Sequence, residues 1–157
     1  MLENKPNSPI YYTNEEDVEG HIYFKKDNLL CSYPSFHDSI EIIYLISGEV
    51  EATCDDQKAI LHPHQIAFME SYETHQYKVL SDKVLAYVIV LSRDYISNFR
   101  NVYSDLTFET FLLDIEKNKK IYDFINLWFE TETRSQLSNI GYSTTLLALM
   151  AELYPLR

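Results

Sequence analysis

Glycine is scarce in this sequence, with three residues among 157. Loops that cradle a phosphate group need several closely spaced glycines before a helix. The sharp strand-turn-helix that presents a nucleophilic serine is equally recognisable in a sequence. Neither pattern occurs here, so the sequence argues against nucleophilic catalysis and against a phosphate-binding loop.

Cysteine is rarer still, because Cys31 and Cys54 are the only two. Two cysteines are too few for a disulfide scaffold and too isolated for a zinc cluster. Free thiols and a cytoplasmic location are therefore expected. The N-terminus lacks the basic-then-apolar order of a signal peptide, and no apolar run reaches membrane-spanning length. We expect no membrane partner.

Basic residues are in the minority, with 13 Lys and Arg against 24 Asp and Glu and a formal net charge of −11. A surface that binds the phosphate backbone of DNA needs the opposite balance. We therefore expect that this chain does not bind DNA by itself.

The most informative stretch runs from Ser35 to Gly48. Residues 40–47 are rich in β-branched and aromatic types and predict a strand. Side chains alternate along a strand, so Glu41 shares a face with two apolar neighbours, and His37 joins that face if the extended chain reaches back to it. Gly48 then supplies the backbone freedom of a tight hairpin turn. A histidine and a glutamate aimed into a β interior are costly to bury, which singles them out.

The rest of the chain divides into strands followed by helices. Short apolar segments separated by turn residues recur at the spacing of a β-barrel or double-sheet jelly roll, and a turn is predicted at Lys25 to Asn28. Further strands are predicted at residues 21–24, 29–33, 49–54, 57–61, 66–70, 75–80 and 84–91.

After Leu91 the apolar period changes to that of helices, predicted at 92–102, 116–132 and 138–153, with Ser92 and Ser138 as candidate N-caps. The segment 106–113 fits strand, loop or helix entry. Strands first and helices last indicate an α+β fold that is mainly β. The predicted organisation is a flexible N-terminal arm at 1–20, a barrel at 21–91, and a helical dimerisation region at 92–157 that forms one compact domain with the barrel.

Two short motifs resemble those of the cupin superfamily. Its first motif runs His-x-His, three or four residues, Glu, six residues, Gly. His37, Glu41 and Gly48 keep that spacing, and Ser35 stands in place of the first histidine. The second motif is similar to Pro63-His64-Gln65 with His75 further on. The resemblance implies a cupin-like β-barrel.

The sequence Glu-Ile-Ile-Tyr-Leu-Ile-Ser-Gly-Glu at 41–49, with the strands and proline turn after it, resembles the N-terminal sensor domain of AraC-type transcription regulators. The resemblance covers residues 22–91. It implies a domain that binds a small-molecule effector, forms a homodimer, and is not an enzyme. Helix-turn-helix units outside this chain would bind DNA. The predicted effector contacts are Ser35, His37, Glu41, His75 and Tyr77, and a sugar is one polar ligand that would suit them.

Three interpretations of His37, Glu41 and His75 stay open: a polar ligand pocket, a metal site, and structural hydrogen bonding. Together these residues have the composition of a two-histidine, one-carboxylate triad for Fe(II) or Mn(II). Because Ser35 removes one usual ligand, we expect no metal and no other cofactor. The rival function is a metal-dependent cupin enzyme, a dioxygenase or an isomerase. A third possible function is that of a dimerisation scaffold, in which the barrel binds no ligand.

A dimer seam is predicted on the last two helices, whose apolar residues fall on one face of each. The alternative is that both faces are covered by the barrel of the same chain. The predicted seam consists of Ile121, Phe124, Ile125, Trp128, Leu146, Leu147, Met150 and Leu153.

Overall fold

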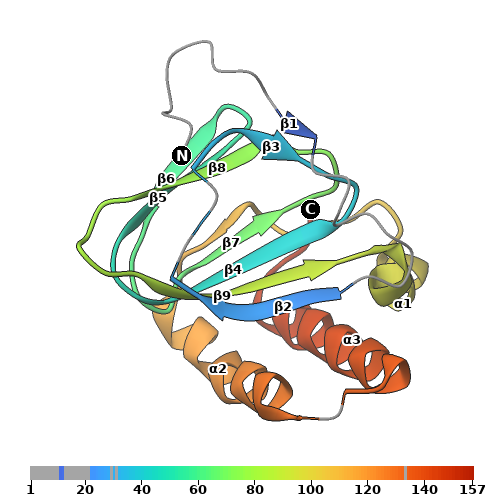
Figure 1. The fold of residues 1–157 in the computed structure, drawn as a ribbon. Coiled ribbons are helices and arrows are strands. Elements are labelled where there is room, and N and C mark those ends of the chain that lie inside the picture. The colour runs from blue at the N-terminus through green and yellow to red at the C-terminus, as the bar shows by residue number, and fades with distance from the viewer. Residues whose placement is uncertain (1–10, 13–21, 29, 31, 133) are drawn as a thin grey trace.

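A computed structural model describes residues 11–12, 22–28, 30, 32–132 and 134–157. Two five-stranded sheets face each other, and helices cover the outer side of one of them (Figure 1). The first sheet has the order β1-β3-β8-β5-β6. Its strands are β1 (Tyr11–Tyr12), β3 (Ser35–Phe36), β8 (His75–Val79), β5 (Val50–Cys54) and β6 (Gln57–Leu61).

The second sheet has the order β10-β7-β4-β9-β2, with the predicted central strand β4 in its middle. Among the described residues the two sheets share no strand, so the jelly roll does not close into a continuous barrel. The fold is a pair of mainly antiparallel sheets with helices after the last long strand, as predicted. The strands of this sheet are β10 (Phe111–Leu112), β7 (Ile66–Met69), β4 (Ile40–Ser47), β9 (Leu85–Leu91) and β2 (Ile22–Asp27).

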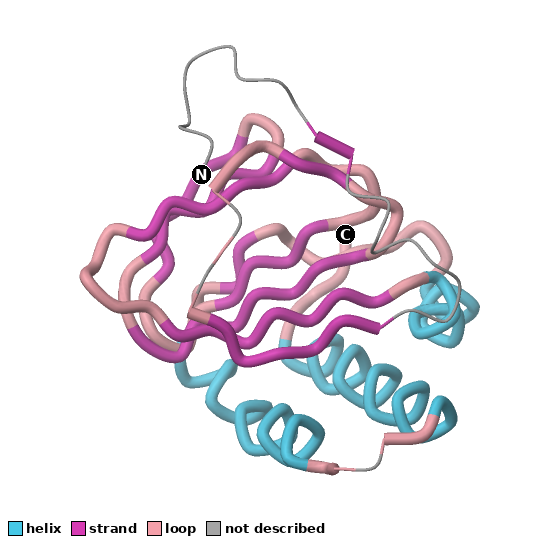
Figure 2. The backbone as a smooth tube through the Cα atoms, in the orientation of Figure 1, coloured by secondary structure: helices cyan, strands magenta, loops and turns pink. Residues whose placement is uncertain are grey.

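Three helices follow β9: α1 (Arg93–Tyr103), α2 (Ile115–Glu130) and α3 (Gln136–Leu153). Helices α2 and α3 lie side by side beneath the second sheet, whereas α1 lies at its end (Figure 2). Among the described residues, none of the helices is long and apolar enough to cross a membrane.

The helix caps differ in part from the sequence prediction. Ser92 precedes α1, but its side chain makes no capping hydrogen bond. Helix α3 begins earlier than predicted, because Ser135 rather than Ser138 is its cap, and the Ser135 hydroxyl accepts from the Ser138 backbone N–H at 3.1 Å. Asp114 caps α2 by accepting from the N–H of Lys117.

Two apolar cores lie on opposite faces of β4. Ile42 and Tyr44 point toward the helices, where they pack with the buried Trp128. Ile43 and Leu45 point between the two sheets. The period of two along a strand therefore divides one hydrophobic run between two cores, and a strand covered on both sides reads as continuously apolar.

Gly48 makes the tight turn after β4, with a φ of +94°. The predicted antiparallel hairpin is wrong, because the turn leads into β5 of the facing sheet, and β4 and β5 pair with other strands. A Cβ atom there would collide with the backbone carbonyl of Lys83 and lie 2.8 Å from the Ser81 hydroxyl. Both the left-handed backbone and the close neighbours exclude a side chain.

Two predictions near the N-terminus are wrong. Lys25, Lys26 and Asp27 belong to β2 and pair with β9, so they do not form a turn. The strand predicted at 29–33 is absent among its described residues, Leu30, Ser32 and Tyr33, and the chain next pairs at Ser35. Of the predicted arm, only Tyr11 and Tyr12 are described, in a short parallel pairing with β3. Its remainder lies outside the described residues.

Candidate functional site

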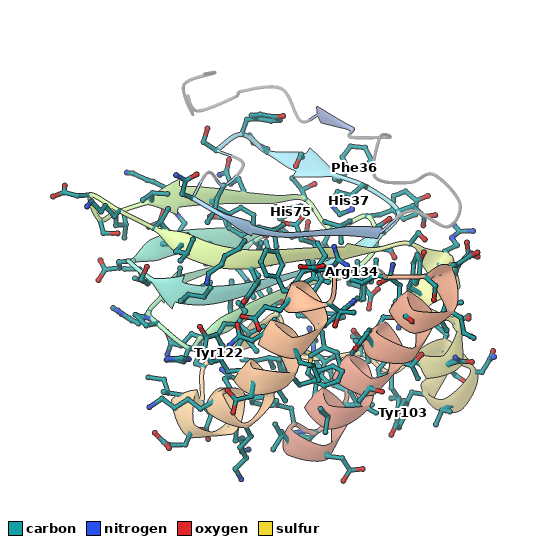
Figure 3. The ribbon with its side chains drawn as sticks, turned by 60° about the horizontal axis from the view of Figure 1, so that its bottom comes forward. Phe36, His37, His75, Tyr103, Tyr122 and Arg134 are labelled. Carbon is teal, nitrogen blue, oxygen red and sulfur yellow. The ribbon has the colours of Figure 1, made fainter. Side chains whose placement is uncertain are left out.

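The five predicted effector contacts lie together between the sheets. Ser35 on β3 is directly opposite His75 on β8, and Tyr77 is two residues along the same strand. Glu41 reaches them from β4 of the facing sheet, and His37 from the connection between β3 and β4. Figure 3 shows His37 and His75 close to each other. All five residues are at most 7% exposed, so this polar cluster is buried.

The Glu41 carboxylate is the centre of the cluster. Its Oε1 accepts a hydrogen bond from the Tyr77 hydroxyl at 2.7 Å. Its Oε2 lies 3.1 Å from Nε2 of His37 and 3.4 Å from Nε2 of His75. One carboxylate thus faces two imidazoles and a phenol, brought in from both sheets.

The protons of the two histidines follow from their other ring nitrogens. Nδ1 of His37 lies 2.8 Å from the backbone carbonyl of Ser39, and Nδ1 of His75 lies 2.9 Å from that of Glu73. A carbonyl oxygen only accepts, so each Nδ1 carries a proton. Each Nε2 therefore approaches Glu41 either as the second N–H of an imidazolium or with a lone pair that a cation can share.

Electrostatics keep Glu41 ionised. Burial alone would raise its pKa, but the attraction of His75 and hydrogen bonds from His37 and His75 outweigh that effect and hold the pKa well below the usual range. A buried carboxylate is tolerable because the Tyr77 hydroxyl donates to it and two imidazoles lie beside it.

The donor set fits a divalent cation. The ligand atoms of His37, Glu41 and His75 all lie within 4.8 Å of one another. Two imidazoles and one carboxylate form a common iron-binding combination. Metal-binding histidines also usually donate their other ring N–H to a carbonyl or carboxylate, as both do here. Ser35 occupies the place of the further histidine, so three protein ligands converge. The expected absence of a metal stays a prediction.

The sequence prediction missed two neighbours of the cluster, Cys54 and Glu73. Cys54, treated only as an isolated thiol, is on β5 and pairs with His75 of β8. Its Sγ donates to the Glu73 carboxylate at 3.2 Å. Burial, with that hydrogen bond, raises the pKa of the Cys54 thiol, so it stays neutral. The alternation of Val50, Ala52 and Cys54 could have placed this thiol on the inner face.

The predicted dimer seam needs a correction. Six of its eight residues are buried within the protomer, where they pack between the helices and the second sheet. Phe124 and Leu153 are half-buried against the same core. The apolar faces of α2 and α3 are therefore used to cover the chain's own sheet, which is the alternative considered above. The six are Ile121, Ile125, Trp128, Leu146, Leu147 and Met150.

Two solved structures illustrate what this chain is similar to among the many that match. ToxT K231A from Vibrio cholerae is 10% identical, with a TM-score of 0.53, and the similarity covers 85% of this chain and 56% of that one. The S161A mutant of Bacillus subtilis oxalate decarboxylase is 14% identical, with a TM-score of 0.40, over 44% of this chain and 20% of that one. The chain therefore spans about half of ToxT and about a fifth of oxalate decarboxylase. At 10% identity, the similarity to ToxT shows the fold alone.

Sequence comparison with curated proteins finds no match. The cupin domain family, in contrast, matches residues 32–91, from before β3 to the end of β9. That range holds every member of the buried cluster and most of both sheets. This chain therefore contains a cupin domain, with three helices packed after it.

Proposed function

We propose that this chain is the effector-sensing domain of an AraC-type transcription regulator and is not itself an enzyme. The observation that supports this proposal is that a buried polar cluster lies between the sheets while a layer of helices covers the outer side of one of them. ToxT, an AraC-family regulator, has a similar fold over 85% of this chain, and this similarity supports the proposal. In this proposal the protein acts in the cytoplasm and binds DNA only through a domain outside this chain.

The proposed site combines donors and acceptors that suit a polar effector. Ser35 and Tyr77 offer hydroxyl groups, and the histidines offer N–H groups beside an ionised carboxylate. A sugar or another polyol is a ligand of this kind. Such a ligand regulates only if it binds one arrangement of the domain better than another, because equal affinity shifts no equilibrium.

A homodimer is part of the proposal, with its surface moved from the buried faces to the outer face of α3. Residues 136–151 contain no Asp, Glu, Lys or Arg, whereas the chain carries a net charge of −11. Leu137 is 79% exposed there, and Gly141 and Ala148 are also exposed. Two like-charged copies repel least where the surface is uncharged, and a two-fold axis pairs the same patch on both.

A ligand screen tests the proposed function. Sugars, polyols and other polar metabolites are screened by thermal shift, and each hit is titrated by calorimetry against the wild type and the Glu41→Gln/His75→Ala variant. We expect a wild-type ligand whose affinity falls at least about tenfold in the variant, since two charge-assisted contacts are lost. An effector that binds both proteins equally would place the pocket elsewhere. Lys58→Gln, on the exposed strand β6, is the matched control.

A metal-dependent cupin enzyme is the second candidate, favoured by the converging atoms of His37, Glu41 and His75. A bound divalent cation would supply a Lewis acid that polarises an oxygen ligand. Tyr77 would orient the carboxylate through its Oε1, and the Ser39 and Glu73 carbonyls would orient the two imidazoles. Near-stoichiometric iron or manganese that survives dialysis, and is lost in His75→Ala, would favour this candidate over the sensor.

A further inference from the structure

The segment that carries His37 also holds helix α1. Asp38 follows His37 directly, and its carboxylate forms a two-pronged ion pair with Arg93 at the start of α1. Asp38 Oδ2 lies 2.7 Å from Arg93 Nε, and Oδ1 lies 3.0 Å from Nη2. One peptide unit therefore separates a buried site histidine from a contact with the helix.

The segment that leads to His75 makes a second contact with α1. Glu70, in the turn between β7 and β8, forms an ion pair with Arg100 and accepts from the Thr107 hydroxyl at 2.6 Å. The turn is joined to both histidines: the Tyr72 N–H donates to the carbonyl of His37 at 2.8 Å, and the Glu73 carbonyl accepts from Nδ1 of His75.

Both ion pairs lie on the same side of α1. Arg93 and Arg100 are seven residues apart, which is about two helical turns, so they lie on one face. Between them is a groove of about 490 Å³ lined by Ser71, Tyr72 and Ile96, among others. Ser92 adds no anchor, because its hydroxyl is buried without a hydrogen-bond partner among the described atoms.

The opposite side of α1 is tied to the C-terminal helix. The Ser143 hydroxyl of α3 donates to the backbone carbonyl of Tyr95 at 3.0 Å. The Asn98 side-chain amide donates to the Thr144 hydroxyl at 3.3 Å. A displacement of α1 would therefore strain or break its hydrogen bonds to α3.

We propose that α1 transmits the state of the buried cluster to α3, through the Asp38–Arg93 and Glu70–Arg100 ion pairs. As a regulatory role this rests on the proposed sensor function. A change at His37 or His75 shifts the two segments that carry Asp38 and Glu70, and both ion pairs act on one face of one helix. The groove between the ion pairs leaves space beside α1 for a small shift of the helix, while Tyr95 and Phe99 keep its other side in the helix-facing core.

A double-mutant cycle read by hydrogen exchange tests this coupling without any effector. Glu41→Gln perturbs the buried cluster, and Arg93→Gln/Arg100→Gln releases α1. We expect Glu41→Gln to change the exchange rates of the 93–103 amides by roughly fivefold or more when both arginines are present. In the released protein the same substitution should change them less than about twofold, so the effects are non-additive.

Arg157→Gln is the matched control, because Arg157 forms an exposed ion pair with Glu109 that touches neither site-bearing segment. It should leave the response of α1 to Glu41→Gln unchanged. Additive effects in the cycle would overturn the proposal.

A second measurement runs in the opposite direction and needs no change in the buried cluster. Coupling is reciprocal, so Arg93→Gln/Arg100→Gln should shift the imidazole NMR signals of His37 and His75 at constant pH, whereas Arg157→Gln should not. Unshifted signals would overturn the coupling even if an effector binds. A coupling that is present when no effector can be found would leave this inference intact and remove the sensor function.

Discussion

The two faces of β4 treat buried polar groups in opposite ways. Toward the helices, the buried polar residues are neutral and bonded: Asn139 accepts from the Trp128 indole N–H at 3.1 Å, and Asn118 donates to the carbonyls of His64 and Leu112 at 2.8 Å. Between the sheets, Glu41 is an ionised carboxylate. Burying a neutral group that is hydrogen-bonded costs little free energy, whereas burying a charge costs about 5 kcal/mol per ion.

This difference separates structure from function within one strand. The helix-facing core contains what stability requires, namely large apolar side chains and satisfied amides. The core between the sheets contains a charged cluster, although replacing a whole buried ion pair by apolar residues of similar volume is often neutral or stabilising. A costly group in a well-packed interior is therefore best explained by a ligand or a cation that it serves.

The largest expected effect is on the helix-facing core. Trp128→Ala should lower the free energy of unfolding by about 3–5 kcal/mol, because it removes a fully buried indole and leaves a cavity. Leu127→Ala, one residue away but 57% exposed, should change it by less than about 0.5 kcal/mol. Urea unfolding of both variants measures the difference. Equal losses would mean that α2 faces the sheet with a different side.

The inner face should respond to loss of charge more than to loss of volume. Glu41→Gln keeps the shape but removes the negative charge between two imidazoles, and should lower the free energy of unfolding by about 3 kcal/mol. Glu116→Gln, whose side chain is 84% exposed, is the control and should have almost no effect. If Glu41→Gln were as stable as the wild type, the carboxylate would not be paired as described.

Acid should weaken the inner face selectively. The pKa of Glu41 is lowered in the folded protein, so its contribution is complete above the unfolded value of about 4.5 and is lost as the pH falls below it. Below about pH 4.5, each pH unit should cost the wild type about 1.4 kcal/mol more than Glu41→Gln. The pKa of Glu70 is also lowered, by its hydrogen bonds from Arg100 and Thr107 against the effect of burial, so part of the acid sensitivity remains in that variant. Parallel stability curves for the two proteins from pH 6 to 3 would contradict the assignment.

The smallest effect on folding is expected on the outer surface of the helical layer. Leu137→Asp should change the free energy of unfolding by less than about 0.5 kcal/mol, because the side chain is exposed. It should nevertheless convert the proposed homodimer to a monomer, since it places a charge in the uncharged face of α3. Light scattering measures the state. Glu152→Gln, at the end of the same helix, should leave it unchanged, and a wild-type monomer would remove α3 as a dimer surface.

Much of the architecture could be predicted from local patterns. The alternation along residues 40–47 placed Glu41 inward, and Gly48 marked the tight turn after β4, where the backbone and its neighbours exclude a side chain. That β5 would continue in the facing sheet rather than pair with β4 could not be predicted from the turn. The change of period after residue 91 indicated the helices. Local patterns failed near residues 25–33, where pairing with β9 extended β2 through a segment that has turn-like composition. Pairing is a tertiary effect that overrides weak local preference.

Only the tertiary structure decided what these elements contact. His37 and Glu41 are near in sequence, but His75 and Tyr77 contact Glu41 from the opposite sheet. Spacing along the chain does not predict a distance between two sheets. The apolar faces of α2 and α3 were evident in the sequence, yet a periodic face says only that something covers it. Here the chain's own second sheet covers it, because that sheet has a hydrophobic outer face of its own to bury.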